Sequence, residues 1–186
     1  MKIGIIAAMP EELVYLIQHL ENAKEETVLG NCYHTGTIGS VELVLVESGI
    51  GKVMSAMSVA ILADHFKVDA AINTGSAGAL AAGIEVGDVV IAEKLAYHDV
   101  DVTAFGYEYG QMAQQPLYFE TDKKFVSLIQ ESLSKLDQNW HLGLIVTGDS
   151  FVAGEDKIAT IKKHFPQVLA VEMEGAAIAQ AAHALN

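Results

Sequence analysis

The sequence predicts an α/β fold, arranged as a single three-layer α/β/α domain around a central, twisted, mixed sheet whose strands are mainly parallel. Short apolar runs typical of buried strands alternate along the chain with amphipathic or Ala-rich stretches typical of helices. The length of 186 residues suits one domain, and 51% hydrophobic residues are enough for a full core. We therefore expect residues 1–186 to form one domain.

The N-terminal part of the chain begins with a strand and a helix. Lys2–Ala7 is a short apolar run, and Pro10 suits the first turn of a helix. Within Glu11–Ala23, leucine and isoleucine recur at spacings of three, four and seven, which indicates a helical stripe. Two further strands, Cys32–Ile38 and Val41–Ser48, are expected to form a hairpin around a Gly-Ser turn.

The middle of the chain continues the alternation. Lys52–Phe66 is rich in Ala and Met and predicts a buried helix, and Ala70–Asn73 predicts a strand that ends in a Gly-rich turn. Asp88–Lys94 predicts another strand. The segment Tyr97–Pro116, which is rich in Tyr and Gly, predicts a long loop.

The C-terminal part adds three helices and two strands. Phe125–Leu136 is amphipathic, and Gly175–Leu185 is Ala-rich. The strands are expected at Leu142–Thr147 and Val168–Met173, with a short helix over Glu155–His164 between them.

Composition and charge exclude several classes of function. The formal net charge of −13 disfavours binding to a phosphate backbone, so we expect no nucleic-acid partner. No apolar run reaches the roughly 18 residues that cross a bilayer, so we expect no membrane partner. Cys32 is the only cysteine, which fits a reducing cytoplasm and suggests a packing role in its strand. All 11 basic residues are Lys, so an Arg clamp for phosphate is lacking.

Ligands of parallel α/β folds bind beyond the carboxyl ends of the strands, so the residues there are the candidates for chemistry. Glu11 and Glu12 follow the first strand; they either favour a helix N-terminus electrostatically or supply a base. The small residues of Thr74–Gly78, which include Ser76, form either an ordinary tight turn or a backbone cradle for an oxygen atom.

The later strand ends carry an aromatic ring and two carboxylates. Phe151 is either a surface on which a base stacks or a core aromatic. Glu172 and Glu174 either face solvent or bind sugar hydroxyls, since buried carboxylates need partners. A metal site at His98, Asp99 and Asp101 is disfavoured because nothing else in the sequence completes a ligand set.

Seven segments, taken together and in order, are specific to one family: Met1–Glu12, Ser48–Val53, Asn73–Gly78, Val86–Asp88, Tyr97–Gly110, Gly148–Phe151 and Val171–Glu174. The chain closely resembles the bacterial 5′-methylthioadenosine/S-adenosylhomocysteine nucleosidases, hydrolases within the purine nucleoside phosphorylase and uridine phosphorylase superfamily. The resemblance implies release of adenine from either nucleoside, leaving the thioribose product, in methionine salvage and the recycling of S-adenosylmethionine by-products. It implies a cytoplasmic homodimer with neither cofactor nor metal.

Roles follow from the resemblance at matching positions. Glu12 is similar to the carboxylate that activates water, with Ser76 beside it, and Glu174 to the residue that binds the ribose hydroxyls. A neighbouring subunit would contribute Val102 and Phe105 over the thioalkyl group. The predicted catalytic residues are Glu12, Ser76 and Glu174, and the predicted substrate-binding residues are Ala8, Met9, Ile50, Phe151, Val152, Glu172, Met173, Val102 and Phe105.

The residue types suit this chemistry. Departure of adenine leaves an oxocarbenium-like sugar, which a carboxylate near the ribose stabilises while a second carboxylate activates water. A nucleoside phosphorylase and a non-catalytic nucleoside-binding relative are the alternatives. The first would need a phosphate clamp and would have no use for a water-activating base.

The family pattern continues beyond Asn186 with a strand, an Arg-x-Ile-Ser-Asp motif, a lid and a helix, and its Asp is the acid for adenine N7. The sequence does not contain this motif, and Ala113 stands where the family pattern has Pro. We therefore expect a fragment or a shortened form of the protein, which alone hydrolyses about 10²- to 10⁴-fold more slowly for want of the general acid.

Overall fold

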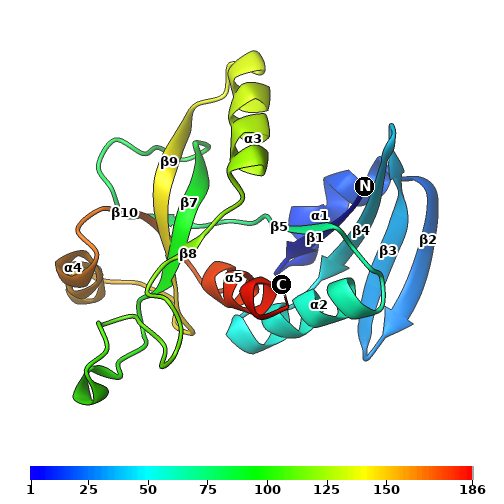
Figure 1. The fold of residues 1–186 in the computed structure, drawn as a ribbon. Coiled ribbons are helices and arrows are strands. Elements are labelled where there is room, and N and C mark those ends of the chain that lie inside the picture. The colour runs from blue at the N-terminus through cyan, green and yellow to red at the C-terminus, as the bar shows by residue number, and fades with distance from the viewer. Residues whose placement is uncertain (186) are drawn as a thin grey trace. The chain divides into compact units, whose positions relative to one another are not determined.

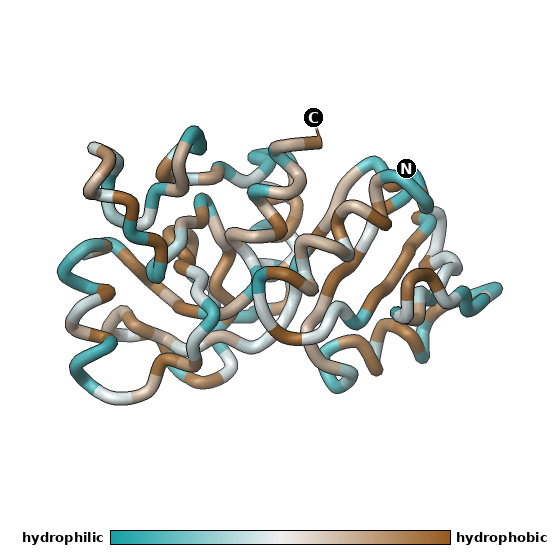
Figure 2. Tube along the Cα trace, turned by 90° about the horizontal axis from the view of Figure 1, so that it is seen from below, coloured by the Kyte–Doolittle hydropathy of each residue, from teal (hydrophilic) through white to brown (hydrophobic). Residues whose placement is uncertain are grey.

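A computed structural model describes residues 1–185 and confirms the predicted α/β class (Figure 1). The strands form two mixed sheets of five strands each, within two compact units. Unit 1 comprises Met1–Ser76 and the end of the chain from Gln180, and unit 2 comprises Ala77–Ala179. Hydrophobic residues run along the central strands of both sheets, and hydrophilic residues gather at the turns (Figure 2).

The sheet of unit 1 has the strand order β2-β3-β4-β1-β5. The pairs β4·β1 and β1·β5 are parallel, whereas β2·β3 and β3·β4 are antiparallel. The elements of unit 1 are β1 (Lys2–Ala7), α1 (Pro10–Gln18), β2 (Glu21–Val28), β3 (Asn31–Ile38), β4 (Val41–Glu47), α2 (Lys52–Asp64) and β5 (Ala70–Asn73).

The core of unit 1 lies between this sheet and its two helices. Ile6 of β1 and Leu45 of β4 are fully buried, together with Leu13 of α1 and Leu62 of α2. Gly4 of β1 permits the approach of α2, because a Cβ atom there would lie 2.8 Å from Leu62 Cδ1. The small residue on the strand is therefore required by the packing of the helix.

Two predictions for unit 1 are wrong. The helix expected over Glu11–Ala23 ends at Gln18, and the following residues form the edge strand β2. This strand is polar and almost wholly exposed, so it shows no alternation of apolar residues, and its pairing with β3 decides its conformation. Cys32 lies in β3 as expected, but its side chain is exposed instead of packed.

The sheet of unit 2 has the strand order β6-β10-β9-β7-β8. Its central pairs β10·β9 and β9·β7 are parallel, and the outer pairs are antiparallel. The elements are β6 (Gly78–Ala79), β7 (Val89–Tyr97), η1 (Thr103–Phe105), β8 (Phe119–Glu120), α3 (Lys123–Lys135), β9 (Trp140–Thr147), α4 (Glu155–His164), β10 (Val168–Glu172) and α5 (Gly175–Ala184), which continues into unit 1.

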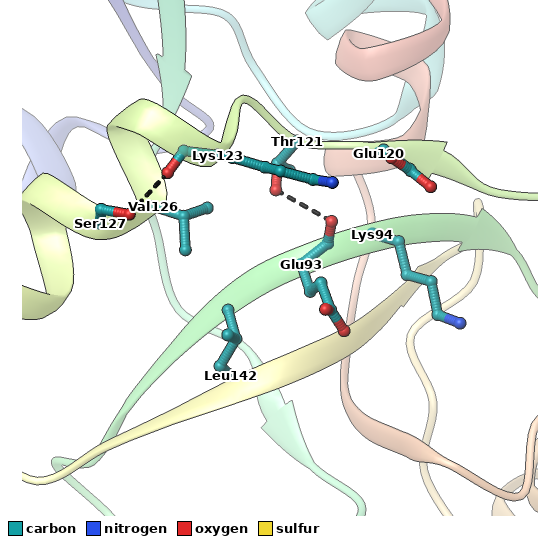
Figure 3. A pocket seen from close by; sticks show the side chains of 8 residues that line it. All are labelled: Glu93, Lys94, Glu120, Thr121, Lys123, Val126, Ser127 and Leu142. Atoms are coloured by element: carbon teal, nitrogen blue, oxygen red, sulfur yellow. Dashed lines mark hydrogen bonds between the residues drawn. The ribbon is translucent and has the colours of Figure 1, made fainter.

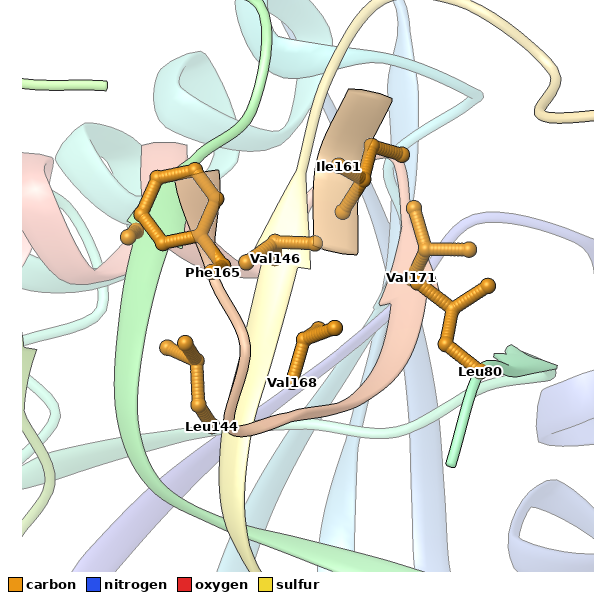
Figure 4. Packing of buried hydrophobic residues seen from close by; sticks show 8 residues of the cluster. Leu80, Leu144, Val146, Ile161, Phe165, Val168 and Val171 are labelled. Atoms are coloured by element: carbon orange, nitrogen blue, oxygen red, sulfur yellow. The ribbon is translucent and has the colours of Figure 1, made fainter. Parts of the chain in front are cut away.

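A cluster of apolar side chains joins α4 to the central strands of unit 2 (Figure 4). Leu144 and Val146 of β9 pack with Ile161 of α4 and with Phe165, the residue that caps this helix. Each of these side chains contributes about 1.5–3 kcal/mol by its burial. The cluster fixes the strand ends that carry the predicted site residues of this unit.

The other elements of unit 2 agree with the sequence apart from their ends. The strand expected over Asp88–Lys94 runs on to Tyr97, and the two-residue strands β6 and β8 were not predicted because they are too short to carry a pattern. The loop predicted over Tyr97–Pro116 is confirmed from residue 98 onward, with the 3-10 turn η1 within it.

Candidate functional site

The parallel strands of unit 1 end at one level, which brings three segments together. Ala7 of β1 pairs with Glu47 of β4, and Ile6 pairs with Asn73 of β5. Beyond the strands, Ser48 N donates to Ala7 O at 2.8 Å, and Thr74 N donates to Ile6 O at 3.0 Å. Residues 8–12, 48–50 and 74–76 therefore leave the same edge of the sheet, where ligands bind in such folds.

The Glu12 carboxylate accepts four hydrogen bonds at this edge. Its Oε1 atom accepts from Ser76 N at 2.8 Å and from Ser76 Oγ at 3.0 Å. Its Oε2 atom accepts from Ala8 N at 3.0 Å and from Met9 N at 3.1 Å. The structure thus brings together the predicted catalytic pair Glu12 and Ser76, and the carboxylate stands in a fixed orientation.

Local sequence explains how Glu12 reaches this position. Pro10 occupies the first turn of α1, and Glu12 reaches back to the backbone N–H of the N-cap residue Met9, as in a capping box. Gly75 allows the carboxylate to lie against the following turn, because a Cβ atom there would lie 3.0 Å from Glu12 Oε1. Glu11, the other candidate at this position, is exposed.

The other residues of unit 1 that the sequence predicted for the site are Ala8, Met9 and Ile50. Ala8 and Met9 are half-buried, and their backbone N–H groups contact Glu12. Ile50 follows β4 and is 59% exposed, which is high for an isoleucine. An apolar side chain left in this way is available to a ligand or a partner.

The parallel strands of unit 2 also end at one level. Thr147 of β9 pairs with Tyr97 of β7 on one side and with Glu172 of β10 on the other. The next residues along each strand, at 98–99, 148–152 and 173–175, therefore leave the same edge of this sheet. These segments contain the predicted site residues Phe151, Val152, Met173 and Glu174, and Glu172 is the last residue of β10.

Glu172 lies under the first turn of α5 and is held by protein groups. Its Oε2 atom accepts from Glu174 N at 2.8 Å and from Gly175 N at 2.6 Å, and its Oε1 atom accepts from the Thr147 hydroxyl. Burial raises the pKa of the Glu172 carboxyl above its usual range, against the lowering effect of these hydrogen bonds. The positive end of the helix dipole also favours a carboxylate at this point.

Glu174 is buried, with 9% of its surface exposed, and begins the turn that opens α5. Its backbone oxygen accepts from the N–H groups of Ala177 and Ile178. Its Oε2 atom accepts from Met173 N at 3.3 Å, and Met173 itself is half-buried. The reading in which both glutamates face solvent is therefore wrong, since the strand end encloses them.

Phe151 has 80% of its surface exposed, so the core role considered for this ring is wrong. Its neighbour Val152 is half-buried and packs against the core cluster of unit 2. The segment that carries both is tied down at its start, because Asp149 N donates to Asp99 Oδ2 at 2.8 Å. The chain thus presents a large aromatic face to the outside from an anchored loop.

The long loop of unit 2 presents the two residues expected at a neighbouring subunit. Phe105 in η1 is 82% exposed, and Val102, which caps this turn, is half-buried. Asp101 fixes the turn by accepting from Thr103 N at 3.1 Å and from Thr103 Oγ1 at 2.7 Å. These hydrogen bonds from Thr103 hold the pKa of the Asp101 carboxyl below its usual range.

A hollow of about 350 Å³ in unit 2 lies away from all of these residues (Figure 3). Lys94 and Glu93 of β7 line it together with residues of β8 and the start of α3. Its mixed charges give it no evident preference for one ligand. In residues 1–185, no group of three or more His, Cys, Asp and Glu side chains could hold a metal ion, and no helix is long and apolar enough to cross a membrane.

One residue that contacts the predicted site was not singled out from the sequence. Thr147 ends β9 and is fully buried, and its hydroxyl contacts both Glu172 and the N-terminal turn of α5. A polar residue at the end of an apolar strand is the signal that could have identified it, because a buried hydroxyl needs a partner.

Known proteins resemble the chain over its whole length. The sequence matches the family model of the phosphorylase superfamily over residues 2–186. The structure is similar to the 5′-methylthioadenosine/S-adenosylhomocysteine nucleosidase of Streptococcus pneumoniae with a transition-state inhibitor, at 84% identity and a TM-score of 0.97, covering 100% of this chain and 81% of that one.

Two further solved structures are similar to the chain. The S-adenosylhomocysteine nucleosidase of Streptococcus pyogenes, in complex with 5-methylthiotubericidin, is 62% identical with a TM-score of 0.97, covering 99% of this chain and 78% of that one. The 5′-methylthioadenosine/S-adenosylhomocysteine nucleosidase of Neisseria meningitidis, in complex with methylthio-immucillin-A, is 43% identical with a TM-score of 0.97. The match covers 99% of this chain and 80% of that one.

Proposed function

This chain belongs to the phosphorylase superfamily and, within it, to the 5′-methylthioadenosine/S-adenosylhomocysteine nucleosidases, and we propose that it hydrolyses the N-glycosidic bond of these two nucleosides. The products are adenine and the corresponding thioribose. The observation that carries the proposal is the Glu12 carboxylate, which Ser76 and two backbone N–H groups orient at the carboxyl ends of the unit 1 strands. Solved relatives with a bound transition-state inhibitor and with an adenine derivative support it.

Glu12 is proposed to take a proton from the attacking water. A carboxylate has about four acceptor positions, and three of the four donors to Glu12 are backbone N–H groups that cannot turn away. The Ser76 hydroxyl is the fourth donor and can rotate. Its rotation frees one lone pair on Oε1 for the O–H of a water molecule, so Ser76 positions both the base and its water.

Glu174 is proposed to accept hydrogen bonds from the ribose hydroxyls and to stabilise the positive charge that develops on the sugar. A buried carboxylate is effective in this role because the low dielectric strengthens its interaction with a nearby cation. The exposed ring of Phe151 offers a stacking surface for adenine, and Met173 offers an apolar contact to the sugar.

The direct test is adenine release from 5′-methylthioadenosine in phosphate-free buffer, measured with enzyme in excess so that slow turnover is detected. We expect adenine release without phosphate, and a fall of about 10²- to 10⁴-fold in Glu12→Gln, which keeps the shape of the side chain but cannot accept the proton. Release that requires added phosphate would instead indicate a phosphorylase. Binding of the nucleoside with no adenine formed would indicate a non-catalytic relative.

We further propose that the enzyme is a homodimer in which Val102 and Phe105 of each subunit cover the substrate of its neighbour. The exposure of Phe105 on an anchored turn supports this arrangement. Equal mixing of Glu12→Gln with Phe105→Ala tests it, because the Phe105→Ala subunit of a mixed dimer has an intact Glu12 and receives the partner's Phe105. Recovery of activity above the mean of the two variants is expected, and sedimentation gives the oligomeric state.

The cytoplasm is the proposed location. The sequence has a single cysteine, Cys32, whose thiol is exposed, and an exposed thiol persists best in a reducing compartment. The slight desolvation of the thiol by its surroundings and the nearby Glu25 carboxylate raise the pKa of Cys32 above its usual range, which favours the protonated thiol.

A further inference from the structure

We propose that Thr147 and Glu172 form a positioning pair. The pair sets the orientation of Glu174 and thereby its hydrogen bonds to the ribose hydroxyls. This inference rests on the proposed function, in which Glu174 binds the ribose hydroxyls. It gives Glu172 a role within the protein, in place of the substrate contact predicted from the sequence.

The hydrogen bonds of Thr147 can be assigned without ambiguity when Glu172 is ionised. Ala176 N lies 2.8 Å from Thr147 Oγ1 and can only donate, so the hydroxyl oxygen is an acceptor there. The hydroxyl proton is then directed at Glu172 Oε1, which can only accept. Thr147 therefore connects the end of β9 to the strand end of β10 and to the first turn of α5.

Glu172 accepts hydrogen bonds from three protein donors. The Thr147 hydroxyl and the backbone N–H groups of Glu174 and Gly175 all point at its two oxygens. Beneath it, Gly148 N donates to its backbone oxygen at 3.2 Å. These donors occupy three of the about four acceptor positions of the carboxylate. Its bonds to the backbone are strong because each of them is charge-assisted.

The backbone on both sides of the Glu174 side chain is thereby fixed. The Glu174 N–H and the next N–H along the chain, that of Gly175, end on the same Glu172 oxygen. Gly175 suits this close packing, since a Cβ atom there would lie 2.5 Å from Leu95 Cδ2 and 3.2 Å from Glu172 Oε1. With its backbone held and its surroundings buried, the Glu174 side chain leaves the turn in one direction.

The test compares two substrates in three proteins. The probes are 5′-methylthioadenosine and its 2′,3′-dideoxy analogue, which lacks the hydroxyls that Glu174 would bind. Thr147→Val keeps the shape but removes the hydroxyl, and Thr147→Ser keeps the hydroxyl as the rescue variant. Adenine release is measured at enzyme excess, with melting temperatures as the record of folding.

We expect Thr147→Val to release adenine about 10- to 100-fold more slowly from the ribosyl substrate, and less than about threefold more slowly from the dideoxy analogue. The rate of adenine release by Thr147→Ser should stay within about threefold of that of the parent protein on both substrates. Equal losses on the two substrates would overturn the inference, since they would report a general structural role. No adenine release by the parent protein would instead refute the proposed function itself.

A second variant covers the case in which Thr147→Val does not fold. Glu172→Gln keeps the volume of the side chain and one acceptor oxygen for the two backbone N–H groups, but removes the charge. A selective loss on the ribosyl substrate, larger than about threefold relative to the dideoxy analogue, is expected. An equal effect on both substrates would again overturn the inference.

Discussion

Ser76 donates twice to the same oxygen of Glu12, from its backbone nitrogen at 2.8 Å and from its hydroxyl at 3.0 Å. The two bonds differ in what they can do. The backbone bond ties the turn after β5 to the start of α1 and cannot be exchanged without moving the chain. The hydroxyl bond can be exchanged for one from water by rotation about a single side-chain angle. One residue thus provides both a fixed and an adjustable contact.

Ser76→Ala should reduce adenine release by only about 3- to 10-fold, because it removes one hydrogen bond that water can replace at this exposed position, and it leaves the backbone bond in place. The position is exposed, so the melting temperature should change little. The measurement is the rate constant of adenine release at enzyme excess, with Glu12→Gln measured in parallel for comparison. A loss as large as that of Glu12→Gln would show that the hydroxyl itself takes part in proton transfer.

Gly75→Ala should reduce adenine release by about 10- to 100-fold, because the new Cβ atom would lie 3.0 Å from Glu12 Oε1 and must displace the carboxylate. Gly78→Ala is the matched control, since a Cβ atom there has its nearest contact at 3.4 Å, from Val171 Cγ1. Activity in Gly75→Ala equal to that of Gly78→Ala would show that the position of Glu12 is not critical.

Phe151→Ala should raise the KM for 5′-methylthioadenosine by about 10-fold or more, because loss of a stacked aromatic ring costs about 1–3 kcal/mol per base. Since the ring is 80% exposed, the free energy of unfolding should change by less than about 0.5 kcal/mol. Leu136→Ala, an exposed apolar residue after α3, serves as the control. Severe destabilisation by Phe151→Ala would mean that the ring packs against protein in solution.

Glu172 should give a pH-dependent contribution to stability. Burial raises the pKa of its carboxyl in the folded protein above the usual value near 4.5, so folding favours the protonated form. The stability that the residue contributes is therefore complete below the unfolded pKa and declines as the pH rises through the folded pKa.

The measurement is the difference in unfolding free energy between the parent protein and Glu172→Gln, by urea denaturation at about pH 4 and about pH 7.5. Other titrating groups cancel in this difference. It should favour the parent protein more at the lower pH. A difference that moves toward the parent protein as the pH rises would show that the hydrogen bonds to Glu172 outweigh its burial.

The sequence was sufficient for the apolar strands and for the residues at their ends. Ile6 and Leu45 lie in runs that could only be buried strands, and Glu12 follows one of them directly. It was not sufficient for β2, whose conformation is imposed by its neighbour β3 across the sheet. Tertiary pairing, not local pattern, decides the structure of such a polar segment.

The same distinction applies to the site. Motif order predicted Glu12, Ser76 and Glu174 as catalytic residues and Phe151 and Glu172 as substrate-binding residues. It could not predict the hydrogen bonds of Glu172, which accepts from the Thr147 hydroxyl and from two backbone N–H groups. Only coordinates show that Thr147, 25 residues earlier in the chain, is one of them.

The composition of β2 has a consequence for solubility. An outermost strand offers a row of unpaired N–H and C=O groups on which a strand from another molecule could dock. In β2, Glu21, Glu25 and Glu26 accompany a single Lys24, so a second copy docking there would bring like charges together. The charges of β2 thus disfavour pairing with a strand of a second molecule, although β2 forms an edge of the sheet in unit 1.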